Sequence, residues 1–388
     1  MQSILTINAG SSSIRFAFYQ AGGTLEKQLH GKVDRIGSPD ATLTFKEAGD
    51  ADGSLVVPEG TAATEFLLNW VELQPVFKRV TAVGHRIVHG MHHTAPERIT
   101  EALLEELRSI RFYDPEHLPR EIELIEAIQK RHPQLAQTAC FDTAFHQSMP
   151  RVAKMMAIPR RYEAKGVQRY GFHGLSYAYL MEELVRLGDH AATSGRVILA
   201  HLGNGASMAA VCEGQGMDTS MGFTPTSGLV MSTRCGDLDP GLVSFLSRTE
   251  GMRATQFQHL ANHESGLLGV SETSSDMRDL LTLEDTDVRA AEAVALFCYQ
   301  AKKWIGSFAA ILGGIDTLVF AGGMGENSAS VRARICAGLE FLGIEINAQR
   351  NENHEEVISS ASGRVHVRVI HTDEEVMIAR LVLRMAAP

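Results

Sequence analysis

Four polar residues of this sequence occur beside glycines or at the predicted ends of strands: Arg86, Asp142, His173 and Arg234. Side chains at the carboxyl ends of strands commonly contact ligands in α/β proteins. Arg86 follows a short apolar run at residues 80–83, and a surface ion pair is the plain structural alternative for it. The histidine between glycines has no obvious packing role, which favours a functional one.

Asp142 directly follows a predicted strand at residues 136–141. A carboxylate in this place is a candidate for holding magnesium, a water molecule or a substrate. Capping a helix N-terminus is an almost equal alternative for it. Arg234 lies in a run rich in Gly, Ser, Thr and Asp that lacks the periodicity of a surface helix. These positions together indicate a site for an anion.

The turn Gly203-Asn204-Gly205 joins two apolar runs, at 197–200 and 208–211, that we predict to be strands. Glycine lets a turn adopt positive φ and approach a ligand closely. Backbone N–H groups clustered in this way favour anions, phosphate above all. An ordinary tight hairpin is the alternative, and it would be preferred if the motif occurred alone.

The same pattern occurs near the N-terminus, where strands predicted at 4–7 and 14–19 flank a turn of small residues at 8–13. Superposing Gly10 on Gly203 aligns strand with strand at a separation of about half the chain. Such a long period indicates two similar domains. A further glycine run at 322–325 follows a predicted strand at 317–320 and precedes a helix. We therefore predict a nucleotide site in a cleft between two lobes.

Bulk properties fit a two-domain enzyme. The chain has 388 residues, which is most simply two domains, and a net charge of −10, which argues against general nucleic-acid binding. Its five cysteines show no CxxC spacing, so we expect reduced thiols in a cytoplasmic protein. No signal peptide or membrane span is expected. The longest predicted helix, at 287–312, carries an apolar stripe that suits the core or a subunit contact.

The ordered motifs of the chain resemble those of the acetate kinases, in the superfamily of acetate and sugar kinases, Hsp70 and actin. The motifs are INAGSSS, GHRIVHG, FDTAFHQSMP, RYGFHG, HLGNG, DTSMGFTP, TRCGDLDPG, SGLLG, SSDMRD, GMGENS and TDEE, and they span nearly the whole length. The resemblance implies a homodimer of α/β chains with duplicated ribonuclease-H-like domains and an interlobe active-site cleft. The domains expected are an N-terminal acetokinase lobe (1–148 plus 376–388) and a C-terminal nucleotide-binding and dimerisation lobe (149–375).

The implied reaction is reversible transfer of the γ-phosphoryl group of ATP to acetate, giving acetyl phosphate and ADP with Mg²⁺ or Mn²⁺. A carboxylate acceptor is already ionised at neutral pH, so the obstacle is repulsion between two anions. The transition state of phosphoryl transfer is loose, so catalysis depends on positioning the reactants and on fixed positive charge. Arginines supply that charge through bidentate hydrogen bonds. The resemblance assigns catalysis to Arg86, Asp142, His173 and Arg234, and the metal to Asn8 and Glu374.

The remaining implied residues bind the acid or the nucleotide. The acid pocket is expected from Arg86, Val88, Phe112, Phe172 and Pro225. The nucleotide is expected on Arg15, His201, Gly203, Asn204, Gly205, Asp276, Met277, Arg278, Gly323, Met324, Gly325 and Asn327. Valine at 88 and phenylalanine at 112 leave little room beyond a methyl group, so acetate should be preferred over propionate, by about 1–3 kcal/mol per methylene.

Several residues depart from the pattern of the acetate kinases. Where the acetate kinases usually have a lysine, a histidine, a threonine, a glutamate and an asparagine, this chain has Arg15, Tyr113, Leu175, Ser227 and Asp373, respectively. Phe112 also replaces a leucine of the acid pocket. None of these changes removes a principal catalytic group.

Three alternatives stay open at the level of sequence. One is a propionate or other short-chain acyl kinase with the same mechanism. Another is a sugar kinase, which would use Asp142 as a base and have no need of two arginines. The third is an ATP-hydrolysing module of the actin or Hsp70 type, although no separate peptide-binding domain is present.

Overall fold

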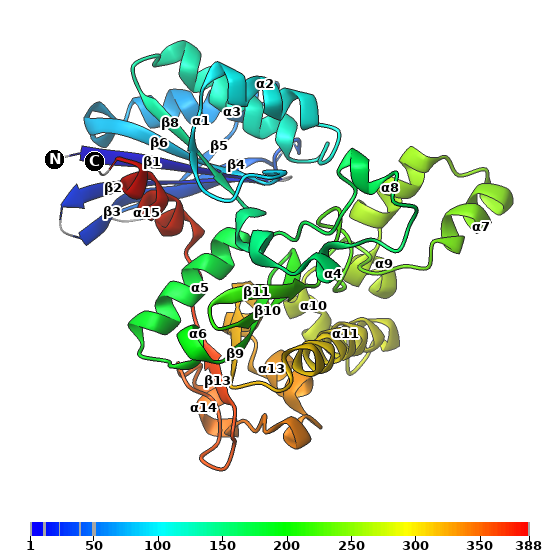
Figure 1. Cartoon of the computed structure of the whole chain (residues 1–388). Coiled ribbons are helices and arrows are strands. Elements are labelled where there is room, and N and C mark those ends of the chain that lie inside the picture. The colour runs from blue at the N-terminus through cyan, green and yellow to red at the C-terminus, as the bar shows by residue number, and fades with distance from the viewer. Residues whose placement is uncertain (1, 11–12, 23, 39, 49–51, 387–388) are drawn as a thin grey trace. The chain divides into compact units, whose positions relative to one another are not determined.

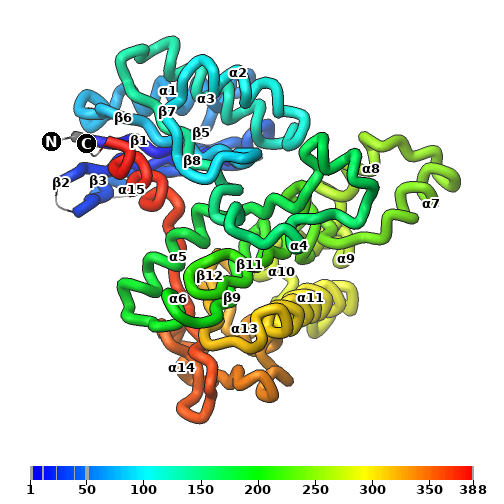
Figure 2. Tube along the Cα trace, in the orientation of Figure 1, coloured from blue at the N-terminus to red at the C-terminus, as the bar shows by residue number. Residues whose placement is uncertain are grey.

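The structure is a computed structural model that describes residues 2–10, 13–22, 24–38, 40–48 and 52–386. The chain divides into two compact units (Figures 1 and 2). Unit 1 comprises residues 1–144, 174–176 and 373–388, and unit 2 comprises residues 145–173 and 177–372. The C-terminal segment therefore belongs to the same unit as the N-terminal strands. Each unit is described by itself below.

Unit 1 is built on a sheet with the strand order β5-β4-β3-β2-β1-β6-β8-β7. Its strands are β1 (Gln2–Ala9), β2 (Ile14–Gly22), β3 (Thr24–Asp34), β4 (Thr42–Glu47), β5 (Gly53–Val56), β6 (Val80–Ile87), β7 (Glu97–Arg98) and β8 (Ala136–Phe141). Strands β1 to β5 form an antiparallel meander. Strand β6 lies parallel to both β1 and β8. The carboxyl ends of β1, β6 and β8 therefore meet at one edge.

Helices cover both faces of this sheet (Figures 1 and 2). They are α1 (Ala63–Glu72), α2 (Glu101–Ile110), α3 (Leu118–Arg131) and α15 (Glu374–Ala386), with the 3₁₀ helix η1 (Pro75–Arg79). Apolar residues of α1 and α3 pack with β1 and β2 in one buried cluster. On the other face, a Cβ at Gly84 would lie 2.5 Å from Ile378 of α15. Glycine in β6 thus lets α15 pack directly against the sheet.

Unit 2 has a second sheet, with the strand order β11-β10-β9-β12-β13. Its strands are β9 (Arg196–Leu202), β10 (Ala206–Cys212), β11 (Gln215–Thr219), β12 (Thr317–Ala321) and β13 (His366–Val369). Strands β9 to β11 are antiparallel, and β12 lies parallel to both β9 and β13. Leu180 and Leu184 of α5 pack on one face of the sheet with Val197 and Leu199.

The helices of unit 2 include one long apolar helix, α11, which contacts β9 and β10. The full set is α4 (Arg151–Lys154), α5 (Gly174–Arg186, whose first turn belongs to unit 1), α6 (Ala191–Ser194), α7 (Gly241–Glu250), α8 (Ala254–His263), α9 (Gly266–Ser271), α10 (Met277–Leu283), α11 (Val288–Leu312), α12 (Gly322–Asn327), α13 (Ala329–Cys336) and α14 (Ala348–Glu352), with the 3₁₀ helices η2 (Ala144–Ser148), η3 (Glu163–Lys165) and η4 (Glu340–Leu342).

The two sheets share one core topology. In each, three antiparallel strands are followed by two parallel ones, as β3-β2-β1-β6-β8 in unit 1 and β11-β10-β9-β12-β13 in unit 2. Gly10 follows β1 and Gly203 follows β9, so the alignment proposed from the sequence pairs equivalent turns. Ser11 and Ser12 of the first turn lie outside the described residues. The predicted fold class, α/β with duplicated ribonuclease-H-like domains, is confirmed.

Some predicted elements were wrong in extent or type. Arg86 does not follow its strand but lies inside β6, one residue before its end. Strands β5 and β11 were not predicted. Within the described residues, no helix is long and apolar enough to cross a bilayer.

Candidate active site

In unit 1, Arg86 is held between carboxylates at the carboxyl edge of the sheet. Its Nη2 donates to Oδ2 of Asp142 at 2.9 Å, and its Nη1 donates to the carbonyl of Ala9 at 3.2 Å. Only 10% of the arginine side chain is exposed. Burial alone would lower the pKa of Arg86, but the charges of Asp142, Glu121 and Glu374 raise it above its ordinary value. The guanidinium therefore stays charged and fixed in direction.

Asp142 is fully buried at the start of helix α5. Its carboxylate accepts the N–H of Leu175 at 3.2 Å, and its carbonyl accepts the N–H of Gly174 at 3.0 Å. The carboxylate of Asp142 thus supports the first turn of α5, and its role in catalysis remains a prediction. A carboxylate at a helix N-terminus is stabilised as an anion, which suits a partner for Arg86.

A second carboxylate, Glu121 of α3, reaches the same arginine. Its Oε1 lies 3.7 Å from Nη1 of Arg86, and its two oxygens accept the N–H of Val88 at 3.2 and 3.0 Å. Sequence reasoning missed Glu121. The signal was present, because Glu121 lies three residues after Leu118 and one turn before Ile125, on the buried face of α3. A carboxylate among such apolar positions needs a buried partner.

Oxygen and nitrogen ligand groups meet where β1 ends and α15 begins. Nδ2 of Asn8 donates to Oε2 of Glu374 at 2.7 Å and to Oε1 of Glu375 at 3.2 Å. Burial raises the pKa of Glu375, opposed by the nearby charge of Arg15, which lies opposite Asn8 in the hairpin. Adjacent carboxylates and an amide suit a hard divalent cation that keeps most of its waters. Among the described residues, no three His, Cys, Asp or Glu side chains form a metal cluster.

In unit 2, two glycine turns lie against each other at the ends of β9 and β12. A Cβ at Gly203 would lie 3.9 Å from the backbone nitrogen of Gly323. Gly322 has a φ of 76°, and a Cβ there would clash with the backbone of Leu202 at 2.9 Å. The second turn therefore needs glycine at 322. Asn204 of the first turn is exposed, and its carbonyl accepts the N–H of Ser232.

His173 and Arg234 converge on the first of these turns. A Cβ at Gly205 would lie 3.3 Å from Nε2 of His173 and 3.5 Å from a guanidinium nitrogen of Arg234. The rings of His173 and His201 stack, with centroids 4.3 Å apart. His173 has a φ of 60°, a strained conformation for a residue with a side chain. In unit 2, His173 and Arg234 therefore lie beside the same glycine turn, and both can donate hydrogen bonds there.

The second glycine turn is braced by Glu326. Its Oε1 accepts the N–H of Gly322 at 2.8 Å and that of Thr372 at 3.1 Å, and its other oxygen contacts His371. Burial would raise the pKa of Glu326, but these hydrogen bonds keep it below its ordinary value. Asn327 donates to the carbonyl of Gly323 at 2.9 Å. The predicted nucleotide residues of this turn therefore lie on an ordered backbone, with Met324 and Gly325 between them.

The other predicted nucleotide residues lie at the start of α10. Asp276 caps this helix by accepting the N–H of Arg278 at 2.9 Å, and the two side chains form an exposed ion pair. Met277 between them is buried. Helix capping, the ion pair and burial account for these three residues within the fold. Their contact with a nucleotide remains a prediction.

The predicted acid-pocket residues differ in environment. Val88 of unit 1 and Phe172 of unit 2 are buried, and the carbonyl of Pro225 accepts a hydrogen bond from Arg234 at 3.1 Å. Phe112 is 70% exposed and its ring lies against Tyr113, at 4.7 Å between centroids. Within unit 1, Phe112 therefore lines no enclosed space, and its role in the pocket remains a prediction.

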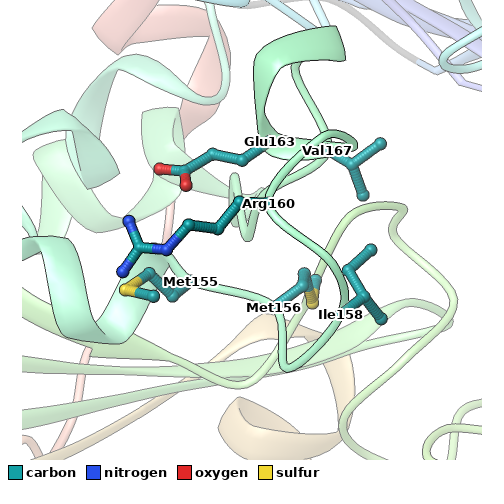
Figure 3. Close-up of a pocket in the computed structure, with 6 residues that line it drawn as sticks. All are labelled: Met155, Met156, Ile158, Arg160, Glu163 and Val167. Carbon is teal, nitrogen blue, oxygen red and sulfur yellow. The ribbon is translucent and has the colours of Figure 1, made fainter.

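A small pocket of unit 2 contains none of these residues. It is lined by Met155, Met156, Ile158, Arg160, Glu163 and Val167, as Figure 3 shows. Most of its lining is apolar and part of it is exposed. It therefore lacks the converging charges that an anion site needs.

The combination of groups defines the class of protein. One ribonuclease-H-like unit holds a buried arginine between carboxylates, and the other holds glycine turns beside a histidine and an arginine. Backbone N–H groups and fixed positive charge are the means by which phosphoryl-transfer enzymes act. The class is therefore a two-domain α/β phosphotransferase.

Comparison with known proteins gives the particular family. The sequence profile of the acetokinase family matches residues 3–380. The chain is 42% identical to an acetate kinase of Rhodopseudomonas palustris over 392 residues, covering 99% of this chain and 98% of that one. The chain belongs to the acetokinase family, as predicted, and it is a kinase that transfers phosphate to acetate.

Solved structures agree with this assignment. The crystal structure of Porphyromonas gingivalis acetate kinase is similar with a TM-score of 0.89, at 36% identity and full coverage of both chains. A propionate kinase from Francisella tularensis is similar with a TM-score of 0.91, at 35% identity, covering 98% of this chain and 99% of that one. The family uses ATP or ADP together with a divalent metal.

Proposed function

We propose that this enzyme transfers the γ-phosphoryl group of ATP directly and in line to the carboxylate of acetate, giving acetyl phosphate and ADP, with Mg²⁺ or Mn²⁺. The observation that carries the proposal is the convergence of His173 and Arg234 on the turn at Gly205. Donors placed there surround a transferring phosphoryl group with positive charge, which a loose transition state requires.

In this proposal, Arg86 binds the acceptor carboxylate. Its contact with Asp142 fixes the guanidinium in direction, as a bidentate interaction with a carboxylate demands. Arg234 neutralises charge between the two reacting anions, and His173 donates a hydrogen bond to the phosphoryl group. Because the acceptor is already ionised, no general base is required. Both arginines must therefore bind the same reacting pair during the reaction.

The nucleotide is proposed on the residues of unit 2. The N–H groups of the turn at Gly203, Asn204 and Gly205 bind phosphates, with His201 beside them. Adenosine is placed on Asp276, Met277, Arg278, Gly323, Met324, Gly325 and Asn327. Arg15 of unit 1 adds positive charge for the phosphates.

Asn8 and Glu374 would hold the divalent cation, directly or through water. Their distance of 2.7 Å from Nδ2 to Oε2 shows that they share one small volume with Glu375. When bound, the cation supplies charge neutralisation for the phosphate oxygens. Asp142 would orient either the water around the cation or the substrate carboxylate.

A hydroxylamine assay tests the proposal. The enzyme is incubated with ATP, Mg²⁺, acetate and hydroxylamine, and acetyl hydroxamate is measured. Product that depends on acetate is expected. Consumption of ATP without hydroxamate would contradict the proposal and favour an ATP-hydrolysing module of the actin or Hsp70 type.

Propionate is the second candidate acceptor, because one of the similar solved structures is a propionate kinase. The buried side chains of Val88 and Phe172 favour the smaller acid. We expect a higher kcat/KM for acetate, with propionate as a slower substrate, since one methylene is worth about 1–3 kcal/mol. The same assay with both acids decides, and a clear preference for propionate would overturn this pocket assignment.

The assembly and compartment are also proposals. A homodimer is supported by α7, which buries none of its residues and exposes Leu242, Val243 and Phe245. Exposed apolar surface of this kind commonly marks a protein interface. Light scattering after size exclusion tests it, and a monomer would contradict it. A cytoplasmic location is supported by five cysteines that all remain free thiols.

A further inference from the structure

Glu121 is a buried carboxyl group that has no part in the mechanism above. It is 2% exposed on α3, and both of its oxygens accept the backbone N–H of Val88. Its Oε1 also lies 3.7 Å from Nη1 of Arg86. The same carboxyl group thus contacts two residues assigned to the acid pocket.

The charges around Arg86 are unbalanced before any substrate binds. Asp142, which follows β8, contacts the guanidinium at 2.9 Å, and Glu121 adds a second carboxyl group. Asp114, from the loop before α3, is buried nearby and bonded to His117 at 2.9 Å. Glu374 also acts on this arginine, so a substrate carboxylate would be a further acid beside one cation. Buried like charges of this kind are costly unless one of them is neutralised.

Nearby acids add to the effect of burial on Glu121. Arg120, its neighbour on α3, directs Nη1 to the carbonyl of Gly10 at 3.1 Å. Burial raises the pKa of Glu121 to about 8, with Asp114 and Asp142 adding to the rise and Arg86 and the Val88 N–H opposing it. The carboxyl group thus holds its proton at neutral pH.

We propose that Glu121 sets the affinity of the pocket for its acid substrate: ionised, it competes with the substrate carboxylate for Arg86, and the substrate binds when Glu121 is protonated. This inference rests on the proposed function and concerns the same pocket. The proton on Glu121 comes from solvent, and the Val88 N–H retains an acceptor in both states.

The sign of the pH effect follows directly. Below pH 8 the carboxyl group is neutral and the KM for acetate should be constant. Above pH 8 each binding event must also protonate Glu121, so the KM should rise by about tenfold per pH unit at the limit. Between pH 7 and pH 9 we expect a rise of about tenfold in the KM for acetate. The KM for ATP, measured in the same samples, should not follow this rise.

The variant Glu121→Gln assigns the effect to this residue. Glutamine keeps an acceptor for Val88 but carries no charge at any pH, so its KM for acetate should stay flat from pH 7 to pH 9. Glu183→Gln is the matched control, because Glu183 is also a buried helical glutamate beside an arginine, Arg186. The control should show the wild-type rise.

The outcomes separate the two proposals. A wild-type enzyme that forms acetyl hydroxamate with a KM independent of pH would overturn the role of Glu121 alone. A rise that persists in Glu121→Gln would overturn it as well. Wild-type enzyme that forms no acetate-dependent product would overturn the proposed function and this inference together. If Glu121→Gln failed to fold, a wild-type KM for acetate that stayed flat from pH 7 to pH 9 would still overturn the proposal.

Discussion

Nδ1 of His173 lies 2.8 Å from Oγ of Ser207, and the same hydroxyl group contacts the phenol of Tyr177. Ser207 and Tyr177 are both fully buried. A hydrogen bond at one ring nitrogen fixes the tautomer and the direction of the other. The serine therefore directs Nε2 of His173 toward Gly205, where the phosphoryl group is proposed to pass.

Ser207→Ala should lower kcat by roughly fivefold, because a buried hydrogen bond of this kind is worth about 1 kcal/mol. The KM for ATP should change little, since the serine acts through His173. Steady-state rates measured with ATP and acetate varied in turn give the test, because they separate kcat from the KM for ATP.

Ser220→Ala is the matched control for this serine. Ser220 is also buried in unit 2, where its hydroxyl group accepts the N–H of Met208 at 2.9 Å. Its loss should lower the melting temperature without altering kcat. Equal kinetic effects from the two variants would refute a positioning role for Ser207.

The second glycine turn depends on Arg332 of α13. This arginine is fully buried and donates to the carbonyls of Gly325 and Glu326 at 2.8 Å, and to Asn351 at 2.8 Å. Arg332→Ala should raise the KM for ATP several-fold and lower stability, because each buried acceptor left without a donor costs about 1–3 kcal/mol. The KM for acetate should be unchanged.

Arg334 offers a control on the same helix, because it forms a more exposed ion pair with Glu284 at 2.6 Å. Arg334→Ala should leave the KM for ATP unaltered and cost less than about 1 kcal/mol. Thermal unfolding and kinetics of both variants test the argument. An unchanged KM for ATP in folded Arg332→Ala would count against a nucleotide site at this turn.

Asp373 ties the start of α15 to the sheet of unit 1. Its carboxylate pairs with Lys27 at 2.6 Å, lies 3.4 Å from the hydroxyl of Tyr19, and accepts the N–H of Val376 at 2.9 Å. Asp373→Ala should release Glu374 and raise the Mg²⁺ concentration needed for half-maximal activity several-fold. Titration of activity with Mg²⁺ at saturating ATP measures this.

Asp287→Ala is the control for lost helix capping, because Asp287 caps α11 in the same manner through the N–H of Arg289. It should cost about 1 kcal/mol of stability and leave the Mg²⁺ requirement unchanged. A Mg²⁺ requirement that is the same in Asp373→Ala as in wild type would remove the support for a metal at Glu374.

Elements with an uninterrupted hydrophobic pattern could be predicted from the sequence alone. The apolar run before Asp142 predicted β8 with its observed bounds, and the stripe ending at Gly313 predicted α11 to within one residue. The repeat of strand, glycine turn and strand predicted the duplicated topology, because both copies keep the same order of elements. Elements with weak local signal, such as β5 with its exposed residues, were missed.

The candidate site was predicted less completely, for a physical reason. Glycine turns and arginines beside them are visible in the sequence because their chemistry is local. Glu121 hydrogen-bonds a residue 33 positions away, and Ser207 hydrogen-bonds one 34 positions away. The sequence around each of them gives no indication of these partners. Arg86 was expected just past the end of a strand, because the apolar run at 80–83 stops at Gly84. In the structure Gly84 instead makes room for α15.

The central claim is that Arg86 and Arg234 together allow a small carboxylate to accept a phosphoryl group. The most direct measurement is the initial rate of acetyl hydroxamate formation by Arg86→Ala and Arg234→Ala, with Arg196→Ala as control. Arg196 belongs to unit 2 and pairs with Asp316 at 2.6 Å on a partly exposed surface.

We predict that each of the first two variants loses about 10²–10³-fold in rate, as for a lost donor to a transition-state oxyanion. The control should stay within about twofold of wild type, because a surface ion pair contributes little. Near wild-type rates in both Arg86→Ala and Arg234→Ala would contradict the account.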